Sequence, residues 1–182
     1  GGRIVFPMVS VGATENAIMA AVLAKGSSEL VNAAREPEIS DLADCLNAMG
    51  AQISGHGTDT IMIEGVNSLG GATHRVVADR IEAGTFAIAA GITGGSLTLK
   101  QARPRHLDAL IEVLRLSGID VREVNDDLIV TATDRVLATD ISTDPFPGFP
   151  TDLQAQFMAM MCVADGSSRI SETIFENRFM HV

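Results

Sequence analysis

The sequence repeats itself, and this repeat constrains the fold more than any single motif does. When the 182 residues are laid on themselves with an offset of 68 positions, Gly26 falls on Gly94 and Gly50 falls on Gly118. Each of these glycines follows an apolar segment with helical spacing, where glycine is a common C-terminal cap. A repeat of this length indicates that one supersecondary unit is built more than once.

The first repeat is predicted to have the element order βαβαββ. Leu42, Leu46 and Met49 have helical spacing and would share one face, whereas other segments alternate or are rich in β-branched residues, as strands are. The predicted strands are residues 3–6, 28–33, 51–57 and 60–65, and the predicted helices are residues 13–26 and 38–50.

The second repeat is predicted to have the same order, with residues 14–25 and 82–93 as equivalent helices. Its strands are 74–78, 96–102, 120–125 and 127–133, and its helices are 80–95 and 106–119. A third repeat begins with a strand at 138–143, a helix at 152–166 and a strand at 167–174, and it stops before a second helix.

These units predict an α+β (mixed α/β) fold. With 46% hydrophobic residues the chain can bury a core. A sheet with one apolar face and two amphipathic helices cannot cover its own apolar surfaces, so such units stack on copies of themselves. The turn-like, Gly-rich stretch 65–74 predicts a domain boundary near residue 76.

The charge balance argues against two classes of partner. Thirteen basic and 23 acidic residues give a net charge of −10, which repels nucleic-acid backbones and anionic membrane surfaces. The longest apolar run, 17–24, is far shorter than the roughly 20 residues that a membrane span needs. Residues 1–7 do not resemble a signal peptide, so we expect a cytoplasmic location.

The cysteines and histidines do not predict a metal site. Cys45 and Cys162 lie on apolar helical faces 117 positions apart, which favours two buried thiols over a disulfide. The histidines show no ligand spacing with each other or with the cysteines. They are His56, His74, His106 and His181.

Three stretches combine small or charged residues with a helix start. Residues 9–17 offer backbone N–H groups to a phosphate or carboxylate, although an ordinary Ser or Thr cap explains them too. Residues 34–41 are typical of a solvated helix start, and 78–85 of a surface ion-pair cluster. The charged residues of the last two stretches are Arg35, Glu36, Glu38, Asp79, Arg80 and Glu82.

A fourth candidate joins Asp152, at the start of a predicted helix, to Arg178, beyond the last predicted strand. Loops at one end of a βαβ-type unit cluster, so the two side chains are expected to face one cavity. An arginine there suits a phosphate or carboxylate, and an aspartate can take a proton from a hydroxyl. A purely structural role for Asp152, as a helix N-cap, also fits the sequence.

Six segments resemble the UDP-N-acetylglucosamine enolpyruvyl transferase family. They are SVGATENA, NAAREPEISDLA, GTDTIMIEGV, DRIEAGTF, PGFPTDLQAQFMAMM and ETIFENRFMHV. The resemblance covers the whole chain and keeps the order and spacing of the segments. The sister family that makes enolpyruvylshikimate phosphate shares the fold but not these strings.

The resemblance implies an inside-out α/β barrel, or alpha-beta prism, of two lobes, each built from three βαβαββ units. Residues 1–76 correspond to the last unit of one lobe, and 77–182 to the first unit and part of the second unit of the other. The chain has no initiator methionine and no capping sequence at its end, so we expect an internal fragment.

The resemblance also implies an activity. The family moves the enolpyruvyl group of phosphoenolpyruvate onto the 3-hydroxyl of UDP-N-acetylglucosamine, in the first committed step of peptidoglycan synthesis. The reaction is an addition followed by an elimination, and it needs no cofactor or metal. The family's catalytic Cys matches neither Cys45 nor Cys162 and lies upstream of this sequence, so this chain alone is expected to be inactive.

Site residues follow from the resemblance position by position. Asp152 matches the proposed base, and we expect it to cap its helix as well. The matching substrate-binding positions are Ser10, Val11, Gly12, Thr151, Asp152, Ile174, Arg178 and Arg80. Of these, Ser10 to Gly12 match a contact to the UDP part, Ile174 a nucleotide-sugar contact, and Arg178 an arginine near phosphoenolpyruvate. Met8 stands where some members carry a Lys.

Two other interpretations are open on the residues alone. A standalone repeat protein of the same fold could bind a nucleotide sugar or a protein without catalysis. An enzyme that modifies RNA ends is opposed by the charge of −10. If the chain is a fragment, its uncovered apolar faces predict that it self-associates in isolation.

Overall fold

The computed structural model describes residues 1–182, which form two compact units, Gly1–Val77 and Ala78–Val182. None of the helices combines the length and the apolar character that a membrane span requires. The assignment of the two units to two lobes of a larger enzyme remains a prediction.

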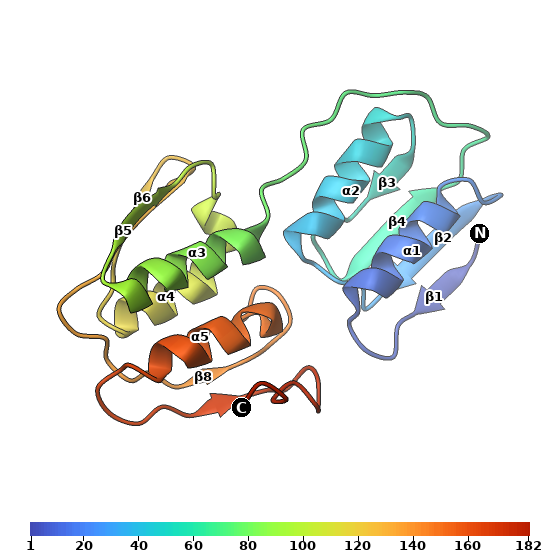
Figure 1. The fold of residues 1–182 in the computed structure, drawn as a ribbon. Helices are drawn as coiled ribbons and strands as arrows, with labels where there is room; N and C mark the ends of the chain where they lie inside the picture. The colour runs from blue at the N-terminus through green and yellow to red at the C-terminus, as the bar shows by residue number, and fades with distance from the viewer. The chain divides into compact units, whose positions relative to one another are not determined.

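The first unit has the predicted βαβαββ order (Figure 1). Its sheet has the strand order β1-β2-β4-β3, in which β1 and β2 are parallel and the other neighbours are antiparallel. The elements are β1 (Arg3–Val5), α1 (Val11–Ala21), β2 (Ser27–Val31), α2 (Pro37–Ala48), β3 (Gln52–Ser54) and β4 (Thr60–Glu64).

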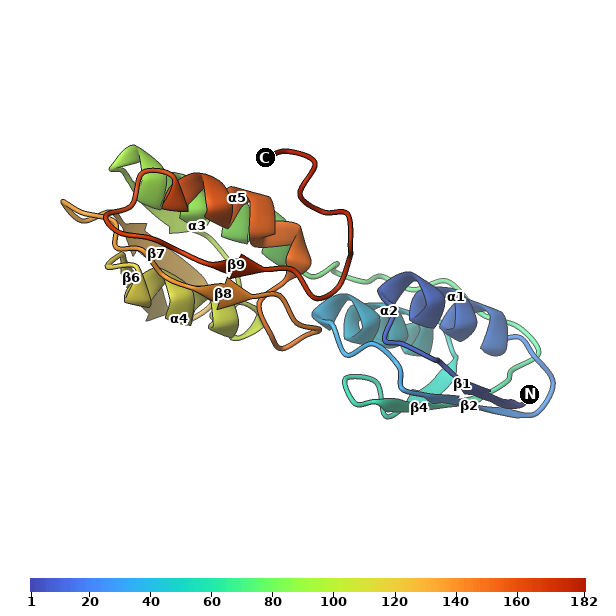
Figure 2. The same cartoon turned by 90° about the horizontal axis from the view of Figure 1, so that it is seen from below.

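One face of this sheet holds the core of the first unit. Along β4, Ile61 and Ile63 are fully buried, whereas Met62 and Glu64 between and after them are exposed. This alternation is expected of a strand with one covered face. Helices α1 and α2 lie over the covered face (Figure 2), and the core between helices and sheet includes Ile18, Leu30, Ile39, Leu46 and Ile53.

The second unit contains counterparts of five of the six elements of the first unit. In its three-stranded sheet, of order β5-β7-β6, the strands correspond to β2, β4 and β3 of the first unit, in the same order. Gly94 and Gly118 have φ angles of 70° and 83°, and Gly26 and Gly50 likewise have positive φ. The elements are α3 (Arg80–Thr93), β5 (Ser96–Leu99), η1 (Pro104–His106), α4 (Asp108–Leu116), β6 (Asp120–Val124) and β7 (Asp127–Thr131).

The predicted equivalence of two helices is confirmed, but their ends differ. Helix α1 ends at Ala21, four residues before the predicted end, whereas α3 continues to Thr93. The carbonyl of Val22 accepts a hydrogen bond from the backbone N–H of Val66 at 2.8 Å, outside the helix. The tertiary contact therefore ends α1 before Gly26 is reached.

The prediction of a strand at 74–78 is wrong. The carboxylate of Asp41 holds this segment on the first unit, because its Oδ1 lies 3.0 Å from His74 Nε2 and accepts a hydrogen bond from Val77 N at 3.0 Å. No strand pairs with the outer edge of β5. The second repeat therefore reads αβαββ, and the expectation of two complete repeats fails at this element.

The third repeat begins as predicted. It comprises β8 (Ile141–Ser142), η2 (Thr151–Leu153), α5 (Gln154–Met161) and β9 (Ile170–Ser171), and β8 pairs with β9 in parallel, as β1 does with β2. Helix α5 packs against α3. In Figure 1 the helices α3, α4 and α5 lie between the three-stranded sheet and the β8–β9 pair, as expected for an inside-out arrangement with its helices within.

Two glycines bring α3 close to the third repeat. A Cβ atom added at Gly84 would lie 2.5 Å from Cδ1 of Leu153, and one at Gly91 would lie 3.1 Å from Sδ of Met160. Leu153 and Met160 are fully buried. The small residues of α3 therefore let the η2–α5 segment settle onto this helix.

The expectation of two buried thiols is wrong. Cys162 is exposed, and Cys45 is only partly buried. Cys162 is the C-cap residue that follows α5, where the helix ends and its apolar face no longer packs on the core. On α2 the buried positions are Ile39, Ala43 and Leu46, so Cys45 lies at the margin of the buried stripe.

Candidate functional site

The site starts with Thr151 and Asp152, which lie in the short η2 turn before α5. Pro150 is the N-cap of η2, and Leu153 is that of α5; neither cap is made by a side chain. The expectation that Asp152 caps a helix is therefore wrong. The 3-10 turn places Asp152 inside its first turn with the side chain directed outward, so its carboxylate is available to other groups.

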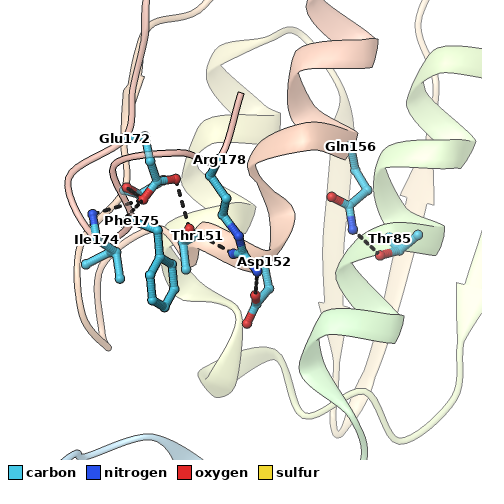
Figure 3. Close-up of polar contacts among 9 residues, drawn as sticks. Thr85, Thr151, Asp152, Gln156, Glu172, Ile174, Phe175 and Arg178 are labelled. Atoms are coloured by element: carbon cyan, nitrogen blue, oxygen red, sulfur yellow. Dashed lines mark hydrogen bonds and ion pairs between the residues drawn. The ribbon is translucent and has the colours of Figure 1, made fainter. Parts of the chain in front are cut away.

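Arg178 approaches Asp152 from the end of the chain. Its Nη2 lies 2.6 Å from Asp152 Oδ1, and its Nη1 donates a hydrogen bond to Thr151 Oγ1 at 2.8 Å (Figure 3). The guanidinium carbon also lies 5.1 Å from the centre of the Phe175 ring, a cation–π distance. The Arg178 and Asp152 side chains are 39% and 49% exposed, so the pair is open to a ligand.

Glu172 lies behind this pair and was not predicted from the sequence. Its Oε2 accepts a hydrogen bond from Thr151 Oγ1 at 2.8 Å, and its Oε1 accepts from Thr143 Oγ1 and Ile174 N, both at 2.9 Å. Oε1 also accepts from Phe175 N at 3.2 Å. An acidic residue just after a strand gives no periodic signal, so sequence alone did not single it out.

The pKa of Glu172 reflects two opposing effects. Partial burial raises the pKa of this carboxyl, but the hydrogen bonds from Ile174, Thr151, Phe175 and Thr143 favour the charged form more strongly. Together they hold the pKa below its usual range. Glu172 is therefore a carboxylate at neutral pH.

Four predicted site residues come together here: Thr151, Asp152, Ile174 and Arg178 (Figure 3). Ile174 is placed through its backbone N–H, which donates to Glu172. Gln156 on α5 donates a hydrogen bond to Thr85 on α3 at 3.0 Å and ties the start of α5 to the neighbouring helix. The cluster thus rests on elements that the core fixes.

Ser10, Val11 and Gly12 begin α1 in the first unit. Ser10 is the N-cap, and its Oγ accepts a hydrogen bond from Ala13 N at 3.3 Å. The ordinary capping interpretation of residues 9–17 is confirmed. A Cβ atom at Gly12 would have no heavy atom within 4 Å, so the backbone there is open to a ligand.

Arg80 is placed differently from the predicted surface ion-pair cluster. It is only 8% exposed, and its guanidinium lies 5.7 Å from the centre of the Phe146 ring. It lines a cavity of about 10 Å³, which is room for one water molecule. Asp79 is the N-cap of α3 and accepts hydrogen bonds from Ile81 N and Glu82 N at 2.8 and 3.0 Å.

Glu36 also departs from the predicted solvated helix start. It is the N-cap residue of α2 but makes no side-chain cap, and it is 7% exposed. Its Oε2 is buried without a hydrogen-bond partner. Pro37, which follows, occupies the first helical position, where its fixed φ suits the helix.

Comparison with known proteins identifies the group to which the chain is similar. Residues 1–182 match the model of the family described as EPSP synthase (3-phosphoshikimate 1-carboxyvinyltransferase). UDP-N-acetylglucosamine 1-carboxyvinyltransferases of Gluconacetobacter diazotrophicus and Cereibacter sphaeroides are 58% and 60% identical to the chain over 182 residues. The chain spans 43% of the length of each of these two relatives.

A solved structure supports the fold. The crystal structure of the enolpyruvyl transferase NikO from Streptomyces tendae superposes on this chain with a TM-score of 0.79 at 21% identity. The superposed region covers 93% of this chain and 41% of the NikO chain. At this identity the likeness concerns the fold alone. Since the family model matches the chain from end to end, the chain belongs to the EPSP synthase (3-phosphoshikimate 1-carboxyvinyltransferase) family.

Proposed function

We propose that the chain is part of an enzyme that transfers the enolpyruvyl group of phosphoenolpyruvate to the 3-hydroxyl of UDP-N-acetylglucosamine, the first committed step of peptidoglycan synthesis. The names of relatives that are 58–60% identical over the whole chain support this substrate pair. The observation that carries the proposal is the open Asp152–Arg178 pair, which offers a base and an anion-binding group side by side.

Asp152 is the base in this proposal. Its Oδ1 carries the ion pair with Arg178, so a substrate hydroxyl would meet Oδ2. The hydroxyl oxygen forms a bond to C2 of phosphoenolpyruvate while its proton passes to Asp152, and a second acid protonates C3. Loss of a proton from C3 and of phosphate from C2 then restores the double bond and completes the transfer.

Arg178 binds phosphoenolpyruvate in this proposal. A guanidinium presents a planar fork of donors that matches a carboxylate or phosphate, and Arg178 is 39% exposed, so its donors that do not contact Asp152 or Thr151 are open to a ligand. Thr151 and Ile174 line the same opening, and Ile174 contacts the nucleotide sugar. Arg80 has the least direct role, because it is buried against Phe146.

Ser10, Val11 and Gly12 bind the UDP part in this proposal. The first backbone N–H groups of a helix favour an anion, and Gly12 leaves room for close approach. The reaction uses no cofactor or metal. The relatives are more than twice as long as this chain, and we propose that the catalytic Cys and the remaining binding groups come from the rest of such an enzyme, in the cytoplasm.

The test uses a full-length protein in which these 182 residues replace the matching part of the Cereibacter sphaeroides relative. Asp152→Asn keeps the size of the side chain and removes the basic carboxylate. Phosphate release should fall by about 10²–10⁴-fold, the usual contribution of a positioned acid or base. The melting temperature should hardly change, because an exposed ion pair contributes only about 0–1 kcal/mol.

Two further results decide between functions. Arg178→Lys should weaken the use of phosphoenolpyruvate, because an ammonium cannot reproduce the fork of a guanidinium. If the unsubstituted protein binds UDP-N-acetylglucosamine but releases no phosphate, the chain serves a binding module instead of a transferase. If Asp152→Asn keeps full activity, Asp152 is not the base.

A further inference from the structure

Glu172 joins three chain segments through one carboxylate. It accepts hydrogen bonds from Thr143 after β8, from Thr151 in η2, and from the backbone that follows its own strand, β9. Figure 3 shows this carboxylate on the far side of Thr151 from Asp152. Both of its oxygens therefore accept hydrogen bonds from the protein itself.

The hydroxyl of Thr151 links Glu172 to Arg178. A hydroxyl has one hydrogen and two lone pairs. Because Thr151 Oγ1 donates its hydrogen to Glu172 Oε2 at 2.8 Å, only lone pairs remain to face Arg178 Nη1, also at 2.8 Å. The charge on Glu172 thus fixes the direction in which Thr151 accepts.

Thr143 shows the same arrangement on the other oxygen. Its hydroxyl donates to Glu172 Oε1 at 2.9 Å and accepts from Thr173 N at 2.9 Å, and the residue is fully buried. Thr173 Oγ1 donates in turn to the carbonyl oxygen of Thr143. The segment that leads to Arg178 is therefore tied to β8 as well as to η2.

Arg178 is clamped at two points of its guanidinium. Nη1 donates to Thr151 and Nη2 contacts Asp152, so the plane of the fork is set by two acceptors from neighbouring residues. If Thr151 turned its hydrogen toward Arg178, two donors would face each other and one anchor would be lost. The orientation of Arg178 then depends on a group that Arg178 does not touch.

We propose that Glu172 is a positioning residue that, through the Thr151 hydroxyl, aims Arg178 at the ligand and at Asp152. Its catalytic consequence rests on the proposed function. Its structural consequence, the orientation of Arg178, does not.

Glu172→Gln tests the link from Glu172 through Thr151 to Arg178 without disrupting the turn that follows β9. The amide oxygen can keep the bonds from Thr143, Ile174 and Phe175, which are all donors. The amide NH₂ then donates to Thr151 Oγ1, whose hydrogen must leave this direction, so the substitution removes the acceptor that held the Thr151 hydroxyl in one orientation. The variant therefore removes the carboxylate that orients the Thr151 hydroxyl for Arg178, while it leaves the backbone bonds from Ile174 and Phe175 in place.

The experiment measures phosphate release in the full-length chimaera described above. Glu172→Gln should raise the KM for phosphoenolpyruvate roughly 10- to 100-fold, as expected when one hydrogen bond to a charged group is lost, and should leave the KM for UDP-N-acetylglucosamine within about threefold. Thr151→Val should raise this KM by a similar factor. The double variant should raise it little further, because both substitutions interrupt the same chain of hydrogen bonds from Glu172 through Thr151 to Arg178.

Ser117→Ala is the matched control for stability. Ser117 is fully buried, and its hydroxyl donates to Val113 O at 2.9 Å and lies 3.0 Å from Thr139 Oγ1, away from the cluster. This variant should lower the melting temperature and leave both KM values unchanged. An equal rise of both KM values in Glu172→Gln and Ser117→Ala would mean that Glu172 acts only through stability, and would overturn the proposal.

A structural measurement separates failure of this inference from failure of the proposed function. If the unsubstituted chimaera releases no phosphate, the proposed function fails, and the crystal structure of Glu172→Gln decides the inference. The expected result is an Arg178 that has left Thr151 Oγ1 by more than hydrogen-bond distance. An Arg178 that keeps both anchors would overturn the inference, whatever the activity.

Discussion

Helices α1 and α3 occupy the same place in the repeat, yet one face is open in α1 and covered in α3. With the offset of 68, Asn16 and Met19 on α1 and Leu23, two residues after it, correspond to Gly84, Ala87 and Gly91 on α3. Met19 and Leu23 are 47% and 57% exposed, whereas Ala87 is fully buried. The equivalent face is thus large and apolar on one helix and small on the other.

The cause lies outside the repeat itself. Helix α5, which belongs to the third repeat, packs on α3, and only small residues allow such a close approach. Helix α1 has no such helix on that face in the first unit. The size of the side chains on a repeated helix therefore depends on which element packs against that helix, as well as on the fold of the repeat.

The sheet edges differ in the opposite sense. In the first unit β1 covers the outer edge of β2, whereas the equivalent edge of β5 has no partner strand. In the first unit the edge of β2 is paired with β1 but the outer face of α1 is exposed. In the second unit the face of α3 is covered by α5 but the edge of β5 has no partner strand. Substitutions at matched positions of the two units test this difference.

The largest effect is expected at the covered helix face. Gly84→Ala places a Cβ atom 2.5 Å from Leu153 Cδ1 and 3.0 Å from Leu110 Cδ2, in a packed core. The free energy of unfolding should fall by about 1–3 kcal/mol, as for other overpacked cores. Asn16→Ala at the matched, exposed position should change it by less than about 0.5 kcal/mol. Urea unfolding followed by circular dichroism compares the two, and equal effects would refute the difference between the helix faces.

The next effect concerns the two N-caps at the starts of these helices. Asp79 accepts two backbone hydrogen bonds, at 2.8 and 3.0 Å, whereas Ser10 accepts one at 3.3 Å. Asp79→Ala should therefore cost about 1–2 kcal/mol of unfolding free energy, and Ser10→Ala about 0.5–1 kcal/mol. Hydrogen exchange of the first turns of α3 and α1 locates each loss. A larger loss for Ser10→Ala would contradict this ranking.

A third prediction concerns the open face of α1. We expect the 182-residue chain to self-associate, because exposed apolar patches promote association. Met19→Lys combined with Leu23→Lys should reduce the associated fraction in light scattering. Leu116→Lys, at a residue that is 61% exposed on α4, is the control and should reduce it less. A chain that is monomeric without any substitution would remove the basis of this prediction.

The smallest effect should appear on acidification, in the second unit. Three carboxyls there have pKa values below their usual range: Asp120 through its hydrogen bond from Arg122, Asp127 through its hydrogen bond from Lys100, and Glu172 through bonds that outweigh its burial. Because their pKa is lower when folded, they stabilise the unit above their ordinary values of 3.8 to 4.5, and this contribution is lost as the pH falls below them.

The measurement is the urea midpoint between pH 6 and pH 3, for the unsubstituted chain and for Glu172→Gln. Glutamine does not titrate, so the midpoint of the variant should fall less steeply below about pH 4.5. Above that pH the two curves should run parallel. A steeper acid loss in the variant would have the wrong sign for a carboxyl with a lowered pKa.

Most elements of the fold could be predicted from the sequence because they depend on local pattern. The repeat offset, the apolar stripe of α4 and the glycines after the helices are all visible in the order of the amino acids. The segment 74–78 could not be predicted in this way, because its apolar residues suit a strand and only Asp41, far away in sequence, holds them elsewhere. Tertiary contacts decided against the local pattern.

The candidate site could be predicted only in part for a similar reason. Asp152 and Arg178 could be named from the sequence, but the ion pair between them and the role of Thr151 are geometric facts. Asp152 was expected to cap a helix because Asp at a helix start usually does. The 3-10 turn instead placed Leu153 at the start of α5. No sequence pattern marks Glu172, because its role depends on three segments, distant in sequence, that meet at its carboxylate.

The strand pairings also bear on the order in which the chain can acquire structure during synthesis. Every pair in the four-stranded sheet joins residues between Arg3 and Glu64, and every pair in the three-stranded sheet joins residues between Ser96 and Thr131. Domains fold as units, N-terminal first, as they leave the ribosome. The first sheet can therefore close before β7 is translated, and the growing chain never has to hold an unpaired strand for a partner in the other unit.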